Sequence, residues 1–316
     1  MRFAIFGTGA VGGYVGGLLA LNNHKVSFIA RGAHLEAIRE KGLTLRYINQ
    51  GEVKSDVLKV FATNDPEEVG EVDYIIFGVK AYDTIEAGNK LQPLMGHETA
   101  IITIQNGLDA PHQLSILYGD DSVVAGAVRV EATLGEPGVV IKYGPARDSS
   151  AFEVAELSEV RTTRMEKFVE LLNAAHIKAS LSADPHTVLW TKFLALAPTA
   201  ALTAAARAHG GEVFGFDLTK QLYATLVAEA AAVAHAEGVH FAPEMIERAK
   251  HPLFPLDTAF KSSLQRDFEK GHRTEVDSLL GALVKRAHKY NVPVPHFETL
   301  YALLSLSAKV GYRYSA

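Results

Sequence analysis

Six residues near the N-terminus have the types and spacing of a dinucleotide-binding loop. Gly7-Thr8-Gly9-Ala10-Val11-Gly12 follows the apolar run Arg2–Phe6 and opens an apolar segment that reaches Leu21. In a strand–loop–helix unit, the first glycine permits a tight turn, the second lets the backbone approach a pyrophosphate, and the third lets the helix pack closely on the sheet. The N-terminus of the helix then presents N–H groups to the phosphates. The alternative is a glycine-rich turn that binds no ligand.

The end of the next apolar run indicates which dinucleotide would bind. Lys25–Ala30 is followed by Arg31 and Gly32. An NAD site usually has Asp or Glu at this place for the ribose 2′-hydroxyl, whereas Arg suits the 2′-phosphate. Arg31 therefore favours NADP(H) as the cofactor. A solvated charge at the end of a strand is the alternative.

Lys192 is a candidate proton donor because it is the only formally charged residue between Asp184 and Arg207. A helix that is apolar nearly all round is buried, so we expect this ammonium to be buried too. Burial disfavours the charged form of a lysine, and an ammonium near a reacting carbonyl stabilises and protonates the alkoxide formed by hydride transfer. Alternatively, the stem of the lysine covers apolar surface while its amine reaches solvent.

Four further polar residues have positions that suit a ligand. Lys80 and Asn106 each follow an apolar strand, and ligands of open α/β sheets bind at the carboxyl ends of strands. A solvated lysine and an Asn-Gly turn are equally compatible with those positions. Glu275 falls in the first turn of a helix, where the dipole favours an acid, and Ser263 suits a helix cap. Position alone would single out neither of these two.

Other catalytic chemistries find no support in the residue types. The chain has no cysteine, and its 13 histidines show neither an H-E-x-x-H motif nor clustered metal spacing, so we expect no metal and no recognisable triad. His235 and His240 are five residues apart and not on one helical face. We expect them to be surface or capping residues.

Apolar runs and helix-period segments alternate up to about residue 180, which predicts βαβ units and a parallel sheet. The predicted strands are 3–6, 25–30, 74–79 and 100–104. Extended runs at 42–47 and 53–61 flank Asn49-Gln50-Gly51 and predict a hairpin or two short edge strands. We expect 123–143, which turns at Gly135-Glu136-Pro137-Gly138, to finish the sheet as an antiparallel meander.

Helical periodicity dominates after Asp184-Pro185, which has the residues of a helix N-cap and first turn. The predicted helices are 185–208, 212–238, 243–250, 262–271, 274–290 and 296–310. The fold class is therefore α/β: a Rossmann-type dinucleotide-binding domain at 1–183, followed by an all-helical substrate and catalytic domain at 184–316.

Composition limits the partners and the compartment. The 316 residues carry a net charge of −5 without a long basic run, so we expect a small-molecule partner and no nucleic acid. The absence of cysteine fits a reducing compartment, and no leader is recognisable, so we expect a cytoplasmic protein. The apolar stretch 193–206 is shorter than the ~20 residues of a span, and it predicts a buried core helix and no membrane association. The apolar segment 300–306 makes a homodimer plausible, although core packing explains it as well.

Taken together, these motifs resemble the ketopantoate reductase family (2-dehydropantoate 2-reductases) over nearly the whole chain. The matching segments are Gly7–Gly12, Ile29–Gly32, Val79–Tyr82, Gln105–Gly107, Glu136–Gly138, Leu189–Lys192, Ser262–Gln265 and Arg273–Asp277. The resemblance implies NADPH-dependent reduction of a 2-oxo acid.

The resemblance also implies roles for individual residues. Lys192 would be the proton donor, and Glu275 would assist near the cofactor ribose. Asn106 would bridge nicotinamide and substrate, and Ser263 would meet the substrate carboxylate. Lys80 would lie near the adenosine end of the cofactor, and Ala132 would be a further cofactor contact.

This sequence departs from the family pattern on the substrate side. Where ketopantoate enzymes of the family place asparagines, the chain has Leu196, Ala200, Gly210 and Phe260. A site that hydrogen-bonds a substrate hydroxyl discriminates by ~10⁴ or more, and an apolar pocket discriminates poorly. Three hypotheses follow: a ketopantoate reductase, a family member that reduces a more apolar 2-oxo acid or ketone, and a non-catalytic NADPH-binding sensor.

Overall fold

A computed structural model describes residues 1–144, 150–251 and 259–311 of the chain, which divides into two compact units. The α/β unit comprises residues 1–105 and 110–188, and the helical unit comprises residues 106–109 and 189–316. The division falls within helix α6 (Pro185–Ala206), a little after residue 184. The short loop 106–109 groups with the helices, which nothing in the sequence indicated.

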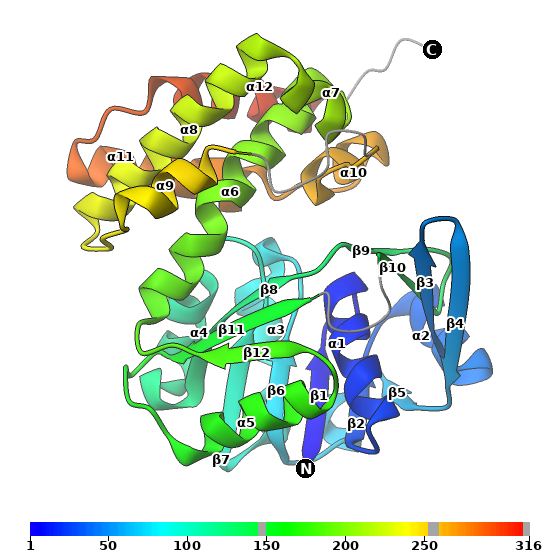
Figure 1. Ribbon diagram of the computed structural model, residues 1–316. Coiled ribbons are helices and arrows are strands. Elements are labelled where there is room, and N and C mark those ends of the chain that lie inside the picture. The colour runs from blue at the N-terminus through cyan, green and yellow to red at the C-terminus, as the bar shows by residue number, and fades with distance from the viewer. Residues whose placement is uncertain (145–149, 252–258, 312–316) are drawn as a thin grey trace. The chain divides into compact units, whose positions relative to one another are not determined.

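Within the described residues, the α/β unit is built on an eight-stranded sheet with the order β12-β11-β8-β7-β6-β1-β2-β5 (Figure 1). All neighbouring strands are parallel except β8 and β11. The strands are β1 (Arg2–Phe6), β2 (Lys25–Ile29), β5 (Phe61–Thr63), β6 (Val72–Phe77), β7 (Met95–Thr103), β8 (Val123–Arg129), β11 (Ala151–Glu156) and β12 (Lys178–Leu181). The predicted α/β class with a mostly parallel sheet is confirmed.

Helices cover both faces of this sheet. Successive side chains of a strand point to opposite faces, so the apolar strand β1 contributes to a core on each side. Phe3 and Ile5 of β1 belong to the core beneath α1 (Ala10–Leu21) and α5 (Thr163–Ala174). Ala4 and Phe6 belong to the core beneath α3 (Thr84–Gly88) and α4 (Ala110–Tyr118). This double burial explains why the central strands are nearly continuous apolar runs. The remaining helices of the unit are α2 (Gly32–Lys41), η1 (Pro66–Glu68), η2 (Ala81–Asp83), η3 (Gln92–Leu94) and η4 (Asp120–Ser122).

A second sheet of four strands has the order β4-β3-β10-β9. Its strands are β3 (Leu43–Asn49), β4 (Glu52–Leu58), β9 (Ala132–Leu134) and β10 (Val139–Tyr143). The hairpin expected around residues 49–51 joins β3 and β4, and Gln50 and Gly51 have the positive φ angles, 50° and 84°, of a tight hairpin turn.

The expectation that residues 123–143 finish the main sheet was wrong. Strand β8 pairs with β7 in the main sheet, but β9 and β10 lie in the second sheet, where β10 runs parallel to β3. The main sheet ends instead with β11 and β12, which were not predicted. Strand β12 has four residues that alternate between exposed and half-buried, so it lacks the apolar run that marks a strand in sequence.

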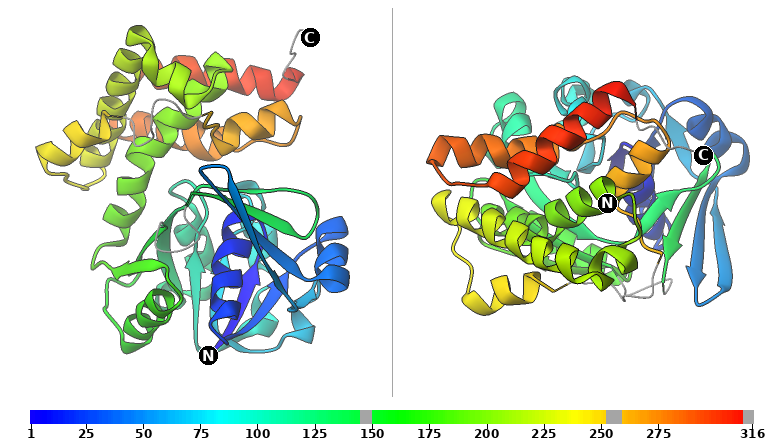
Figure 2. Two further views of the ribbon diagram at one scale, coloured as in Figure 1. Left: turned by 45° about the vertical axis from the view of Figure 1, so that its right-hand side comes forward. Right: turned by 90° about the horizontal axis from the view of Figure 1, so that it is seen from above.

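The helical unit contains α6, α7 (Gly210–Gly215), α8 (Asp217–Ala236), α9 (Pro243–Ala249), α10 (Ser263–Glu269), the π segment η5 (Asp277–Gly281), α11 (Ala282–Tyr290) and α12 (Pro295–Val310). Helices α8, α11 and α12 pack against one another (Figure 2). Two predicted helices are interrupted. Phe216 is extended and separates α7 from α8, and the helix predicted at 274–290 begins with the π segment.

Helix α6 runs through the core of the helical unit, which its composition predicted. Asp184 caps it, accepting a hydrogen bond from the His186 N–H at 2.8 Å. Among the described helices, α6 is long and apolar enough to cross a membrane, and 72% of its most apolar window is buried within the protein. Trp190, Phe193 and Leu194 are each 1% exposed and pack in the same core cluster. The burial is that of a core helix.

Candidate functional site

The loop after β1 is held in place by backbone contacts that glycine alone permits. Gly7 has φ +99°, and a Cβ there would lie 2.7 Å from the backbone nitrogen of Val79. The backbone N–H and the hydroxyl of Thr8 both donate to the carbonyl of Ile29, at 3.2 and 3.0 Å. The loop is therefore tied to the end of β2, beside the position of Arg31.

The N-terminus of α1 is formed as a phosphate-binding loop requires. The first helical hydrogen bond runs from the Gly13 N–H to the Gly9 carbonyl, so the N–H groups of residues 10–12 have no acceptor within the helix. A Cβ at Gly12 would lie 2.5 Å from the Gly7 carbonyl oxygen, so glycine is needed for the helix to approach the strand. A Cβ at Gly9 would meet no atom within 4 Å. Gly9 thus faces open space, where a ligand can come close to the backbone.

Arg31 precedes α2 and extends into solvent. Its side chain is 76% exposed and lies 3.4 Å from the carboxylate of Asp83, which is a loose contact for an ion pair. An exposed pair at this distance contributes little to stability. The guanidinium therefore stays available to a phosphate.

His34 in the first turn of α2 is a neighbour of the loop that sequence reasoning missed. Its Nδ1 accepts a hydrogen bond from the Gly138 N–H at 3.0 Å, so this nitrogen carries no proton. Burial lowers the pKa of His34, and the nearby backbone of Thr8 opposes that shift. A neutral imidazole thus links α2 to the turn between β9 and β10. A lone histidine in a helix carries no sequence signal for such a contact.

Lys80 and Ala132 occupy half-buried positions in the α/β unit. Lys80 immediately precedes η2, and Ala132 begins β9 directly opposite Lys142 of β10. Lys142 was not predicted as a candidate, yet it is only 2% exposed. Burial lowers the pKa of Lys142, and the charge of Glu131 opposes that shift. Lys142 is two residues after the buried Val140, so it shares that face of β10, and this spacing was the signal that would have indicated an inward lysine.

Lys192 and Asn106 are brought together in the helical unit, although 86 residues separate them. The Lys192 ammonium donates to the Asn106 side-chain oxygen at 2.8 Å. Lys192 is half-buried rather than fully buried as we expected, because it lies on a side of α6 that the core does not cover. Leu189, Thr191 and Leu196 are half-buried like Lys192, whereas Trp190, Phe193 and Leu194 on the other side of the helix are buried.

Glu275 and Ser263 have different environments. Glu275 is 6% exposed and lies just before the π segment, where its carbonyl accepts a hydrogen bond from the Leu279 N–H at 3.0 Å. Ser263 is exposed, and the cap of α10 is the preceding residue, Ser262, which accepts from the Gln265 N–H at 3.1 Å. The interpretation of Ser263 as a cap was therefore wrong. Its hydroxyl is not committed to the helix end.

Of the four residues that depart from the family pattern, two lie on α6 and the other two contact each other. Leu196 and Ala200 follow Lys192 by one and two helical turns, and Leu196 is half-buried while Ala200 is 1% exposed. Gly210 donates its N–H to the Phe260 carbonyl at 2.8 Å, and a Cβ at 210 would lie 3.0 Å from the Phe260 ring. A side chain at position 210 would therefore crowd the Phe260 ring.

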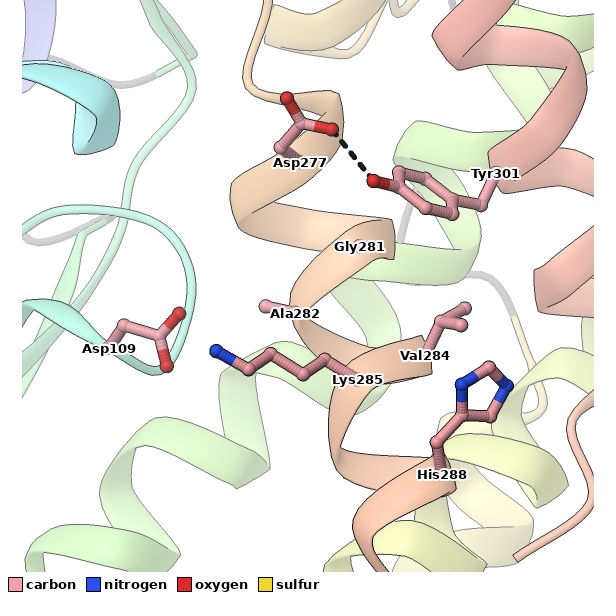
Figure 3. Close-up of a pocket in the computed structure, with 8 residues that line it drawn as sticks. All are labelled: Asp109, Asp277, Gly281, Ala282, Val284, Lys285, His288 and Tyr301. Atoms are coloured by element: carbon pink, nitrogen blue, oxygen red, sulfur yellow. Dashed lines mark hydrogen bonds between the residues drawn. The ribbon is translucent and has the colours of Figure 1, made fainter.

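A pocket of about 540 Å³ opens on the helical unit (Figure 3). It is lined by Asp109, Asp277, Gly281, Ala282, Val284, Lys285, His288 and Tyr301. The Tyr301 hydroxyl donates to Asp277 at 2.9 Å, and a Cβ at Gly281 would lie 2.9 Å from the Tyr301 ring. Neither Lys192 nor Asn106 lines this pocket, so we do not assign the reaction to it.

We also searched the described part of the chain for clusters of side chains that could bind a metal ion. No group of three or more His, Asp or Glu there is placed to hold a metal ion. His235 and His240 do meet, with their Nδ1 atoms 2.7 Å apart. Helical spacing did not predict this contact because α8 ends at Ala236 and the chain turns back.

Comparison with protein families decides the class of the protein. The ketopantoate reductase PanE/ApbA family model matches residues 3–150, and the model of its C-terminal part matches residues 185–308. The chain belongs to the ketopantoate reductase family. The resemblance expected from the motifs is thereby confirmed, and the protein is an oxidoreductase of the ketopantoate reductase type.

Relatives of this ketopantoate reductase family member match it over nearly its full length. The 2-dehydropantoate 2-reductase of Halobacterium salinarum is 29% identical, over 98% of this chain and 100% of that protein. A crystal structure of a PanE/ApbA family ketopantoate reductase from Ralstonia eutropha JMP134 has a TM-score of 0.85 at 29% identity, over 98% and 99% of the two chains. A ternary structure of D-mandelate dehydrogenase with NADH and anilino(oxo)acetate has a TM-score of 0.88 at 24% identity, over 98% and 99%. This last similarity is one of fold.

Proposed function

We propose that this protein catalyses the NADPH-dependent reduction of a 2-oxo acid to a 2-hydroxy acid, with Lys192 as the proton donor. The observation that carries the proposal is the 2.8 Å hydrogen bond from the Lys192 ammonium to Asn106. An ammonium can donate a hydrogen bond to a carbonyl oxygen and a proton to the alkoxide that forms there. Bound NADPH would supply the hydride. Lys192 gives a proton to the substrate oxygen as the carbonyl carbon is reduced, and water then restores that proton.

The residues of the α/β unit fit the cofactor. The N–H groups of residues 10–12 and the open space at Gly9 suit a pyrophosphate, which would be held by residues 7–12. The exposed Arg31 suits a 2′-phosphate and supports NADPH over NADH. Lys80 and Ala132 are proposed as further cofactor contacts, together with Asn106 and Glu275, on the pattern of the family.

The substrate side supports two candidates. Family membership favours ketopantoate, the 2-dehydropantoate of the relatives' names. The half-buried Leu196, one turn after Lys192, favours a 2-oxo acid with a more apolar side chain. Ser263, whose hydroxyl does not cap α10, would bind the carboxylate that both substrates share.

The test is a kinetic panel with NADPH and NADH, using ketopantoate and 2-oxo acids of graded side-chain size. Replacing Lys192 by Met is expected to lower kcat by about 10²- to 10⁴-fold, because general acid catalysis typically contributes that much. The exposed Lys220→Met serves as the matched control and is expected to keep wild-type kcat. Leu196→Asn is expected to shift kcat/KM toward ketopantoate by about tenfold, since the amide can meet a substrate hydroxyl.

Each candidate has a result that would contradict it. Full kcat in Lys192→Met on a good substrate would remove the proposed proton donor. A higher kcat/KM for apolar 2-oxo acids than for ketopantoate would select the second substrate class. Tight NADPH binding without turnover of any compound would favour a non-catalytic sensor instead.

A further inference from the structure

Besides their direct hydrogen bond, the segments that carry Lys192 and Asn106 are linked by a chain of side-chain hydrogen bonds in the helical unit. Arg286 of α11 is the central residue of that chain. We propose that Arg286 is a positioning residue, which holds the 106–109 loop so that Asn106 keeps its oxygen on Lys192. This proposal rests on the proposed function and names a group that controls the same site. The connecting residues, Asp109, Arg286, Glu237 and Trp190, are called the Arg286 bridge below.

One end of the Arg286 bridge holds the loop. The Arg286 guanidinium donates through Nη2 to Asp109 Oδ1 at 2.6 Å, which is a short, charge-assisted hydrogen bond. Asp109 lies three residues after Asn106. Because extended chain advances at most about 3.5 Å per residue, a fixed Asp109 limits where Asn106 can lie.

The other end of the Arg286 bridge returns to α6. Arg286 donates through Nε to Glu237 Oε1 at 3.0 Å, and the second oxygen of Glu237 accepts from the Trp190 indole N–H, also at 3.0 Å. Trp190 is 1% exposed and precedes Lys192 by two residues on the same helix. The guanidinium thus ties the loop to the turn of α6 that carries the proposed proton donor.

The backbone of the loop is constrained between these two anchor points. Gly107 has φ +102°, and a Cβ there would lie 3.0 Å from the Ser278 carbonyl oxygen. Leu108 is 6% exposed and packs in the core of the helical unit. The loop is therefore a packed part of this unit, and Asp109 is the residue through which Arg286 can orient it.

The orientation of the Asn106 amide follows from this arrangement. A lysine ammonium has no acceptor, so the side-chain oxygen of Asn106 must face Lys192. The amide NH₂ of Asn106 then points away from Lys192, as a donor for another group. If the loop rotated, the Asn106 NH₂ group could face Lys192 in place of the side-chain oxygen. The ammonium would then lose the carbonyl that stabilises it.

Burial distinguishes the Arg286 bridge from an ordinary surface ion pair. The side chains of Arg286 and Glu237 are 19% and 20% exposed, and the guanidinium meets two carboxylates at once. Exposed pairs contribute little, whereas breaking a largely buried pair leaves an uncompensated charge. Lysine cannot replace this arginine, because a single ammonium lacks the planar set of donors that reaches both carboxylates.

The experiment uses the full-length protein with two single variants, Arg286→Lys and Asp109→Ala. Both are expected to lower kcat by about 10- to 100-fold with the KM for NADPH within about twofold, because misplacement of a catalytic group by about 1 Å has that effect. The alkaline limb of the kcat–pH profile is expected to move to lower pH, because the ammonium loses a stabilising carbonyl. Asp109 is 44% exposed, so its variant keeps the test valid if Arg286→Lys folds poorly.

Two further measurements separate positioning from general structural support. In an Asn106→Ala background, Arg286→Lys is expected to lower kcat by less than about twofold more, because both changes remove the same interaction. Hydrogen exchange of the amides at 106–109 is expected to be faster in Asp109→Ala. Arg164→Lys is the matched control, since Arg164 is 20% exposed and pairs with a buried glutamate of the α/β unit at 3.1 Å. It is expected to leave kcat and loop exchange unchanged.

The experiments give different results if the positioning role is wrong and if the proposed reaction is wrong. Wild-type kcat in Asp109→Ala, or fully additive losses with Asn106→Ala, would overturn the positioning role. Unchanged exchange at 106–109 would overturn it even in a protein that reduces none of the 2-oxo acids. Absence of wild-type turnover together with faster exchange in Asp109→Ala would reject the reaction and retain the loop-holding role.

Discussion

Arg31 is an exposed side chain that we propose as a contact for the 2′-phosphate of NADPH. Its loose contact with Asp83, at 3.4 Å, holds it weakly, and it stands beside a loop whose Gly9 faces open space. Charge-assisted hydrogen bonds to a phosphate are worth about 1.5–3 kcal/mol. In the proposed function, the preference for NADPH over NADH would therefore depend on a group that contributes little to the free energy of folding.

Replacing Arg31 by Ala is expected to weaken NADPH binding by about 10- to 100-fold and to change NADH binding by less than about twofold. The physical reason is that only NADPH carries the 2′-phosphate. Titration calorimetry at fixed ionic strength measures both affinities. Lys41→Ala, an exposed charge at the other end of α2, is the control and is expected to alter neither. Equal losses for the two cofactors would contradict the assignment of Arg31.

At the scale of elements, the second sheet also packs against helix α1, which follows the glycine loop. Val140 of β10 fills the space that a side chain at Gly13 of α1 would need, where the Cβ would lie 2.7 Å from the Val140 side chain. Lys142, two residues on, points to the same face and is almost fully buried. A lysine in such a place opposes folding unless a ligand or a neighbouring charge compensates it.

Lys142 is therefore expected to make stability depend on pH. Burial lowers its folded-state pKa below the ordinary value of 10.5, so between the two values the unfolded chain binds more protons. The unfolding free energy should then rise as pH increases through that window toward 10.5, and Lys142→Met should lack this rise. Urea unfolding at a series of alkaline pH values measures the difference. Lys54→Met, a 75% exposed lysine of the same sheet, is the control and should keep the wild-type slope.

At the scale of the whole molecule, two units with separate cores carry different parts of the proposed chemistry. The loop at 7–12 and Arg31 belong to the α/β unit, whereas Lys192, Asn106 and Glu275 belong to the helical unit. The homodimer suggested by residues 300–306 stays a prediction. Leu300 and Leu304 are buried in the core, while Leu303 and Leu306 are 57% and 59% exposed.

The single tryptophan of the chain, Trp190, lies in the helical unit and reports on its unfolding. NADP⁺ at 100 times its dissociation constant is expected to stabilise the part of the protein that binds it by about 2.7 kcal/mol. Most of the proposed cofactor contacts, residues 7–12, Arg31, Lys80 and Ala132, belong to the α/β unit. Thermal unfolding followed by hydrogen exchange in β1 and β2 should therefore shift upward more than unfolding followed by Trp190 fluorescence. Identical shifts by both probes would show instead that the two units unfold as one cooperative body.

Much of the fold was predictable because its signals are local. The apolar strands, the glycine loop and the helices after Asp184 each follow from residue periodicity or turn chemistry within a short window. The α/β class and the family were recognised from such windows. The strands β11 and β12 and the membership of β10 in a second sheet were not, because pairing depends on distant partners.

The sequence by itself determined the types of the candidate residues: a glycine loop, an arginine after the second strand and one lysine in an apolar helix. Only the tertiary structure decided which of them meet. Lys192 and Asn106 are 86 residues apart, and Arg286 and Asp109 are 177 apart. Contacts over such separations arise from the packing of whole elements, which no local pattern encodes. The same reason hid the contacts of His34 and Glu237 until the chain was folded.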